Sequence, residues 1–137
     1  MQQGLSLKSL LVPTKTIEID YPGMPGFKIK LGFLSREILL NIRKKSNKVT
    51  VKNRQTQEEF DDDLFIQLYT DNAIKGWSGL KLRYLEQLAP VDLSGQDLDS
   101  ELEYTQENAL YLMRNSTNFD SFVSDTVSDL GNFSKTN

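Results

Sequence analysis

Two segments of alternating apolar and charged residues, joined by a connector rich in proline and glycine, constrain the fold most. The apolar positions recur at every second residue, and they are Ile17, Ile19, Tyr21, Phe27, Ile29, Leu31 and Phe33. Successive side chains of a strand point to opposite faces, so this period predicts two strands with one buried face each. Residues 22–26, Pro-Gly-Met-Pro-Gly, have the composition of a turn. Residues 14–33 are therefore predicted to form an antiparallel β-hairpin.

The side chains also predict the register of this hairpin. If Tyr21 lies opposite Phe27, apolar residues meet on one face and opposite charges meet on the other. The resulting pairs are Ile19 with Ile29, Ile17 with Leu31, Asp20 with Lys28, and Glu18 with Lys30. Each such cross-strand pair contributes roughly 0.2–1 kcal/mol. The agreement of both faces supports the prediction.

Helical spacing of apolar residues follows the hairpin. A first helix is predicted at 36–45, because Ser35 can cap it and Ile38, Leu39 and Ile42 fall on one face. A second helix is predicted at 58–75, with several acidic residues in its first turns, where they suit the helix dipole. Its apolar stripe comprises Phe60, Leu64, Phe65 and Leu68. The polar and basic residues 46–57 are predicted to form an exposed loop, with a short strand at 49–52.

The remainder of the chain is predicted to be rich in helix. Residues 86–104 read as a solvated loop, after which Thr105 caps a helix at 106–114. The last helix starts at Ser116 or Asn118 and runs to about residue 130, where Gly131 fits a C-cap. Its apolar stripe comprises Phe119, Phe122, Val123, Val127 and Leu130.

These elements predict an α+β fold in which a small antiparallel hairpin or sheet near the N-terminus packs against three or four α-helices. A chain of 137 residues can bury a core without a metal ion or a disulfide. We expect a single domain over 1–137, comprising an N-terminal arm at 1–13, a folded body at 14–133 and a disordered tail at 134–137.

The absence of two residue types limits the chemistry of the chain. It contains neither cysteine nor histidine, which excludes disulfides, thiolate and imidazole metal ligands, and nucleophiles activated by histidine. Carboxylate pairs such as Asp61 with Asp97 could act as acid and base, but nothing in the sequence brings them together. We therefore expect no enzyme activity, no catalytic residue, no cofactor and no metal site.

The sequence indicates a soluble protein of the cytoplasm. No apolar run approaches the ~20 residues that cross a membrane. The start, Met1-Gln-Gln-Gly, also lacks the basic and apolar regions of a secretory signal.

Charge is distributed unevenly along the chain. Residues 1–57 hold eleven basic residues against three acidic ones, a net charge of +8, whereas residues 58–137 hold five against sixteen, a net charge of −11. Such polarity allows head-to-tail self-association into rings or filaments. The alternative is that both halves fold into one body and partly neutralise each other.

Several segments together resemble a known family. They are Pro-Gly-Met-Pro-Gly-Phe at 22–27, Ile-Lys-Gly-Trp-Ser-Gly-Leu at 74–80, Leu-Ala-Pro-Val at 88–91, and the ending from Thr105 to Phe133. In this order they look like the tail assembly chaperone family of siphophages and myophages, over about residues 14–133. The Trp77 segment and the ending are the most specific parts.

The resemblance implies a function. Members of that family bind the tape-measure protein, keep its long helical segment soluble and help to recruit the major tail protein. They act in the host cytoplasm and are absent from the mature virion, and many are also made as a longer product by a programmed frameshift. We therefore expect the tape-measure protein, the major tail protein and further copies of this chain as partners, with no membrane partner.

Apolar residues near the chain ends are the candidates for partner binding. In the arm they are Leu5, Leu7, Leu10 and Leu11, and in the last helix they are Phe119 and Phe122. Trp77, between two glycines, is a further candidate, because tryptophan is frequent at interface hot spots. Ordinary core packing is the alternative for Trp77, Phe119 and Phe122.

A small nucleic-acid-binding module is the rival function. The basic zone comprises Arg36, Arg43, Lys44, Lys45, Lys48, Lys52 and Arg54, and it could neutralise phosphates. The chain is acidic overall, however, with a pI near 5.0, and the zone lacks interleaved aromatic residues for base stacking. A gel shift at low salt would discriminate between the two functions.

Overall fold

The computed structural model describes residues 4–12 and 14–133, and it contains the predicted N-terminal hairpin. Strand β1 (Thr16–Asp20) pairs antiparallel with β2 (Lys28–Gly32). The register is the predicted one, with Ile19 opposite Ile29 and the Glu18 and Asp20 positions opposite lysines. Beyond the strands, the Tyr21 amide donates to the Phe27 carbonyl at 2.9 Å. Apolar and charge matching therefore predicted the hairpin correctly.

A third strand, which the sequence did not predict, extends this sheet. The expected helix at 58–75 stops early, and β5 (Ile74–Ser78) pairs antiparallel with β2, giving the order β1-β2-β5. Ile74 lies opposite Leu31 and Trp77 lies opposite Ile29, with a register shift between these pairs. This bulge places two residues three apart on the same face of the sheet. Because a spacing of three departs from the period of two, the sequence pattern did not indicate a strand here.

Four longer helices lie within the described residues. They are α2 (Arg36–Ser46), α3 (Asp62–Ala73), α5 (Gln106–Asn115) and α6 (Thr117–Val127). The caps predicted from sequence are confirmed, since the hydroxyls of Ser35, Thr105 and Ser116 each accept a hydrogen bond from an amide in the first turn. Asp61 caps α3 in the same way, through the Leu64 amide at 3.0 Å.

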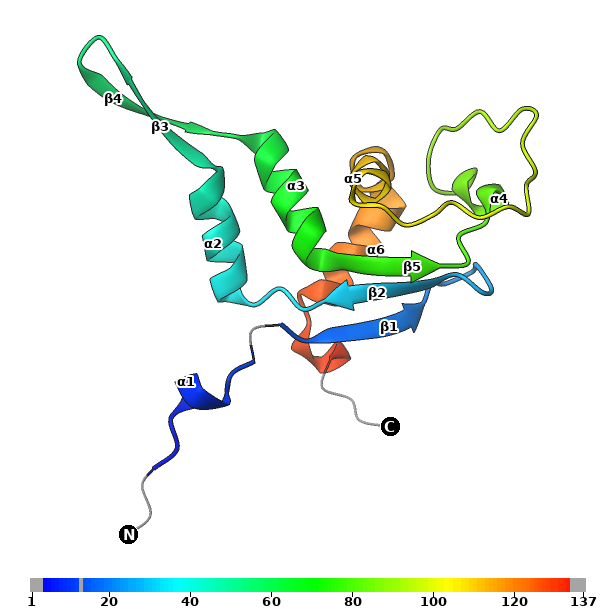
Figure 1. Cartoon of the computed structure of the whole chain (residues 1–137), viewed down its shortest axis with the longest axis horizontal. Coiled ribbons are helices and arrows are strands. Elements are labelled where there is room, and N and C mark those ends of the chain that lie inside the picture. Colours follow the sequence, from blue (N-terminus) through cyan, green and yellow to red (C-terminus); the bar gives the residue numbers. More distant parts are fainter. Residues whose placement is uncertain (1–3, 13, 134–137) are drawn as a thin grey trace.

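Residues 46–57 lie mostly in a second β-hairpin. The predicted exposure and the short strand at 49–52 are confirmed, whereas the loop predicted for the rest of this segment is wrong. Strand β3 (Asn47–Lys52) pairs with β4 (Gln55–Phe60), and Asn53 and Arg54 both have positive φ in the turn. Two-residue turns of this type match the natural twist of a hairpin. As a result α3 begins at residue 62 rather than 58. The hairpin projects from the body at one end of the molecule (Figure 1).

The remaining described elements are short. They are α1 (Leu7–Leu10), α4 (Leu82–Leu85) and a 3-10 turn, η1 (Leu130–Asn132). The predicted C-cap at Gly131 is wrong, because α6 already ends at Val127 with Ser128 as its cap and Gly131 lies inside η1. The predicted disordered tail at 134–137 lies outside the described residues, as do residues 1–3 and 13 of the arm.

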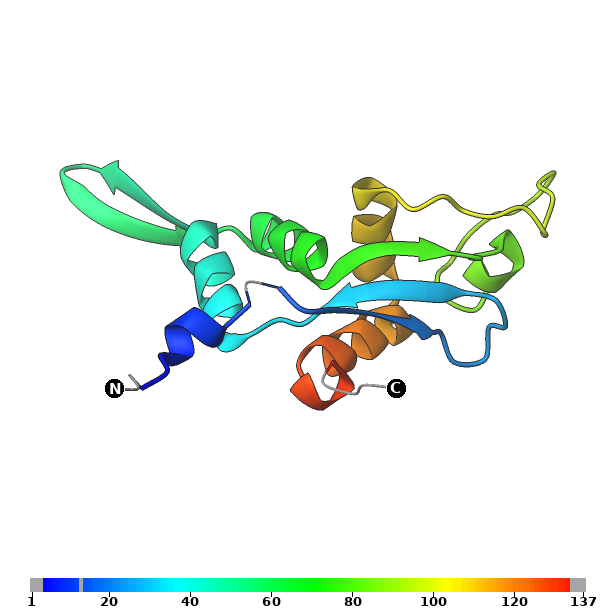
Figure 2. The ribbon, with the colours of Figure 1, turned by 60° about the horizontal axis from the view of Figure 1, so that its bottom comes forward.

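The core forms where the sheet meets the helices, and α6 passes behind the three strands (Figure 1). Phe119, Val123 and Val127 of α6 are fully buried, as are Ile29 and Leu31 of β2. The outer face of the β1–β2 hairpin carries its charged residues and stays exposed. Figure 2 shows the three strands side by side, with the β3–β4 hairpin and the loop at 86–104 at opposite ends of the molecule. The α+β prediction is confirmed.

Candidate functional site

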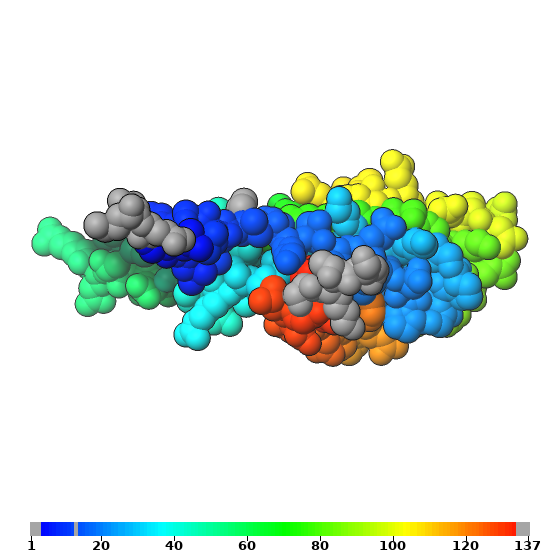
Figure 3. All heavy atoms as spheres, turned by 90° about the horizontal axis from the view of Figure 1, so that it is seen from below, coloured from blue at the N-terminus to red at the C-terminus, as the bar shows by residue number. Residues whose placement is uncertain are grey.

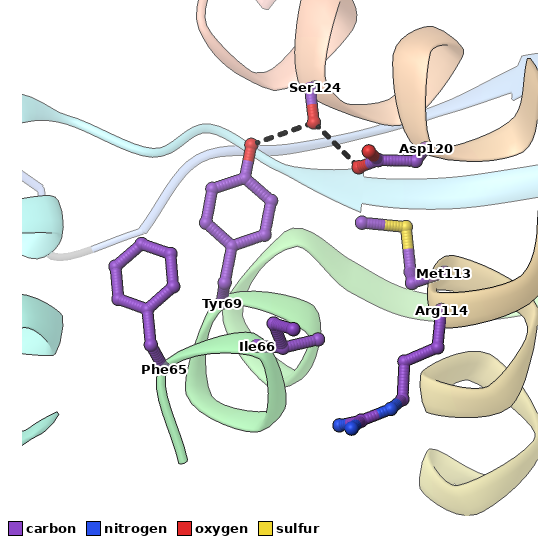
Figure 4. A pocket seen from close by; sticks show the side chains of 7 residues that line it. All are labelled: Phe65, Ile66, Tyr69, Met113, Arg114, Asp120 and Ser124. Atoms are coloured by element: carbon purple, nitrogen blue, oxygen red, sulfur yellow. Dashed lines mark hydrogen bonds between the residues drawn. The ribbon is translucent and has the colours of Figure 1, made fainter. Parts of the chain in front are cut away.

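A groove of about 540 Å³ opens between α3, α5 and α6. We call it the α3 groove, and it is lined by Phe65, Ile66, Tyr69, Met113, Arg114, Asp120 and Ser124. Figure 4 shows the α3 side chains facing those of α5 and α6 across the opening. Phe65, Ile66 and Tyr69 are half-buried. Most of the wall from α3 is therefore apolar, and it remains reachable from solvent.

One end of the α3 groove is polar. The Tyr69 hydroxyl donates to the Ser124 hydroxyl at 3.2 Å, and the Ser124 hydroxyl donates to Asp120 at 3.1 Å (Figure 4). Burial raises the pKa of Tyr69, and the negative charges of Asp120 and Asp125 raise it further. Tyr69 therefore stays a neutral donor at physiological pH, and the end of the groove has an acidic character.

The single cation that lines the α3 groove is already paired. Arg114 donates to Asp63 at the start of α3, with 2.6 Å between Nη2 and Oδ1. Because this pair neutralises Arg114, the carboxylate of Asp120 dominates the charge of the lining. An apolar segment with a positive charge beside it would complement this arrangement.

The apolar wall continues onto the β3–β4 hairpin. Val49, Val51 and Phe60 lie on one face of this hairpin and are 61%, 73% and 47% exposed. We call these three residues the hairpin face. The ring of Phe60 lies 5.6 Å from that of Phe65, so the hairpin face joins the α3 groove. An isolated two-stranded hairpin is marginally stable in water, and a partner lying on this face would stabilise it.

The arm carries a group of strongly exposed apolar residues. Leu5, Leu7, Leu10 and Leu11 are 58–81% exposed, and α1 buries none of its residues. Figure 1 shows the arm set apart from the sheet and the helices, and in Figure 3 its dark-blue atoms lie toward the viewer. The structure thus leaves these four predicted partner-binding residues free to bind.

The three other predicted partner-binding residues lie in or beside the core. Phe119 is fully buried, and its ring lies 6.0 Å from that of Tyr21. Trp77 packs edge-on against Phe119 and donates its indole N–H to the Leu102 carbonyl at 2.9 Å. Phe122 is half-buried against Tyr21. Core packing, the alternative stated above, therefore describes Phe119 and Trp77.

The basic zone falls on α2 and on the β3–β4 hairpin, where acidic residues face it. Lys48 forms an ion pair with Asp61 at 2.9 Å, and its cross-strand neighbour is Glu59. The Leu64 amide and Lys48 both hold the pKa of Asp61 below its usual range. The fold therefore places acidic side chains beside Lys48, one member of the basic zone.

Asp61 and Asp97 lie far apart in the structure and do not form an acid–base pair. Asp61 caps α3 beside the second hairpin, whereas Asp97 lies in the loop at the other end of the molecule (Figure 1). Within residues 4–12 and 14–133, no three acidic side chains gather as a metal site would require. No helix in the described ranges is long and apolar enough to cross a membrane.

Comparison with known families places the chain among phage proteins. A family described as YdaY prophage protein matches residues 32–137, which is most of the chain. The chain belongs to this family. The match to the YdaY family includes the β3–β4 hairpin and every residue of the α3 groove, whereas the arm precedes it. No curated protein and no solved structure matches the chain.

Membership of the YdaY family shows that the chain is of phage origin. The resemblance seen in the sequence implied this origin together with a more specific role in tail assembly. The α3 groove was not predicted, although Phe65 was placed on an apolar stripe. Its walls come from helices about 50 residues apart in the chain, as the partners of the Arg114–Asp63 pair illustrate. The sequence feature that could have indicated the groove is that α3 carries more apolar residues than a single buried stripe requires.

Proposed function

We propose that this chain is a tail assembly chaperone of a long-tailed phage. In this role it binds the tape-measure protein, keeps it soluble and recruits the major tail protein in the host cytoplasm. It works by covering apolar surface, without catalysis, and leaves before the virion is complete. The observation that carries the proposal is the continuous exposed apolar surface formed by the α3 groove and the hairpin face. Membership of a prophage family supports the phage setting.

The shape of this surface suits a helical client. A tape-measure protein is a long, mostly helical chain with exposed apolar stripes, and such stripes bind reversibly to apolar grooves between helices. Phe65 and Ile66 offer half-buried apolar side chains at the groove, and Phe60 prolongs the surface toward the hairpin. The leucines of the arm provide a second apolar contact. Client helices with basic residues beside their apolar stripe would complement the acidic end at Asp120.

A single substitution in the groove tests this proposal. We expect Ile66→Glu to weaken binding of a helical tape-measure segment by roughly tenfold or more, because a carboxylate would be desolvated against apolar side chains. Gln67→Glu is the matched control, since Gln67 is the next residue of α3, is exposed and does not line the groove. Titration calorimetry measures both dissociation constants, and thermal melting verifies that both variants fold. Equal affinities for the two variants would contradict binding in the groove.

A further inference from the structure

The apolar side chains of the arm have no cover within the described part of the chain. Leu7, Leu10 and Leu11 follow the spacing i, i+3, i+4, and the Leu11 amide donates to the Leu7 carbonyl at 3.0 Å. This spacing puts the three leucines on one side of a helical turn, which is the anchor pattern of helices that bind in grooves. A helix of four residues is unstable alone in water. The arm therefore has the form of a ligand that needs a binding surface.

The charges of the arm and the α3 groove are complementary. Between residues 4 and 12 the arm contains one charged side chain, Lys8. The groove pairs its own cation, Arg114, with Asp63 and keeps the carboxylate of Asp120 at its polar end. Leucines that enter the apolar part of the groove would bring Lys8 toward an acidic rim. Both the apolar pattern and the charge thus match between two surfaces of the same chain.

The arm and the groove of one copy lie on different sides of the sheet. The arm leaves the body beside β1, and the strands lie between it and the opening at α3 (Figure 1). When the molecule is seen from below, the dark-blue arm lies on the side that faces the viewer (Figure 3). Only three residues lie between Leu10 and Thr14, and the four steps along the backbone limit the reach of the chain to roughly 14 Å. The groove of a second copy can approach the arm from outside, so the limited reach of the chain does not prevent that contact.

We propose that the arm of one copy binds in the α3 groove of a second copy. This contact is heterologous, so repeated use of it builds a ring or an open filament of copies. It goes beyond the proposed function, because it requires only this chain and is independent of the client. A tape-measure helix that binds the same groove would displace the arm and release the copies from one another.

Site-directed cross-linking tests the contact without background, because the natural chain contains no cysteine. Two single-cysteine variants, Ser9→Cys in the arm and Ile66→Cys in the groove, are mixed and oxidised. We expect a mixed dimer at about ten times the yield obtained when Ser9→Cys is mixed with Gln96→Cys. Gln96 is exposed and lies in the loop far from the groove. Adding Leu10→Asp to the arm variant should reduce the yield to that control level.

Two results would overturn the arm exchange. One is a mixed-dimer yield no higher than that of the Gln96→Cys control. The other is a cross-link formed only inside single chains of a Ser9→Cys/Ile66→Cys double variant, which would show that the arm binds its own groove. Neither result affects the chaperone proposal, which depends on the binding of the tape-measure segment to the Ile66 surface.

Discussion

Replacement of Phe119 by alanine is expected to lower the free energy of unfolding by about 3–5 kcal/mol, because it leaves a cavity at the centre of the core. The Phe119 ring is fully buried between those of Tyr21 and Trp77, with centroids 6.0 and 6.4 Å away. Small domains have a total stability of roughly 5–15 kcal/mol, so this variant should approach unfolding. Urea denaturation followed by the fluorescence of Trp77 measures the loss.

Phe122→Ala is the matched control for Phe119→Ala. Phe122 lies one turn further along α6 and is only half-buried, so its loss should be clearly smaller. A loss below about 1 kcal/mol for Phe119→Ala would contradict a core role, and Phe119 would then return to the candidate interface.

Gly79→Ala is expected to destabilise the protein by roughly 2 kcal/mol or more, because two costs combine at this position. Gly79 has a φ of +74°, which disfavours any residue with a Cβ. The added Cβ would also overlap the carbonyl oxygen of Gly26 and stand 2.8 Å from its carbonyl carbon. The end of β5 could then no longer approach the turn of the first hairpin. Thermal denaturation measures the loss.

The variant Gly23→Ala measures the cost of the backbone conformation alone, without the steric overlap that is expected at Gly79. Gly23 has a similar φ, +76°, but a Cβ there would meet nothing within 4 Å. Its loss should therefore reflect the backbone conformation alone, about 1–2 kcal/mol. Equal losses for the two variants would mean that the close approach of Gly26 and Gly79 contributes nothing to stability.

The sequence predicted local features well where the side chains themselves determine them. The register of the first hairpin follows from charge pairs such as Asp20 with Lys28, and the caps follow from Ser35, Thr105 and Ser116. These features depend on neighbours in the chain or on short cross-strand pairs. The same reasoning therefore recovered the hairpin and the starts of three helices.

The errors arose where tertiary contacts override local pattern. Strand β5 was missed because the bulge opposite Lys30 and Leu31 puts Ile74 and Trp77 on one face at a spacing of three, which hides the alternation of a strand. Of the second hairpin, only a short strand at 49–52 within an exposed loop was predicted, because its strands bury none of their residues and no buried face marks their alternation. Only its exposed valines, Val49 and Val51, and the Asn53 turn carried a signal.

The candidate site was predicted only in part. The exposed leucines of the arm were identified from sequence, whereas Phe119 was offered for the interface and lies in the core. The α3 groove depends on the packing of three helices, which no local pattern reveals.

The most direct test of the chaperone role is the solubility of the tape-measure protein of the same prophage. The measured quantity is its soluble fraction after expression alone, with this chain, and with the Ile66→Glu variant. We expect this chain to move most of the tape-measure protein into the soluble fraction, and the variant to fail. A tape-measure protein that is equally insoluble in all three cases would contradict the account.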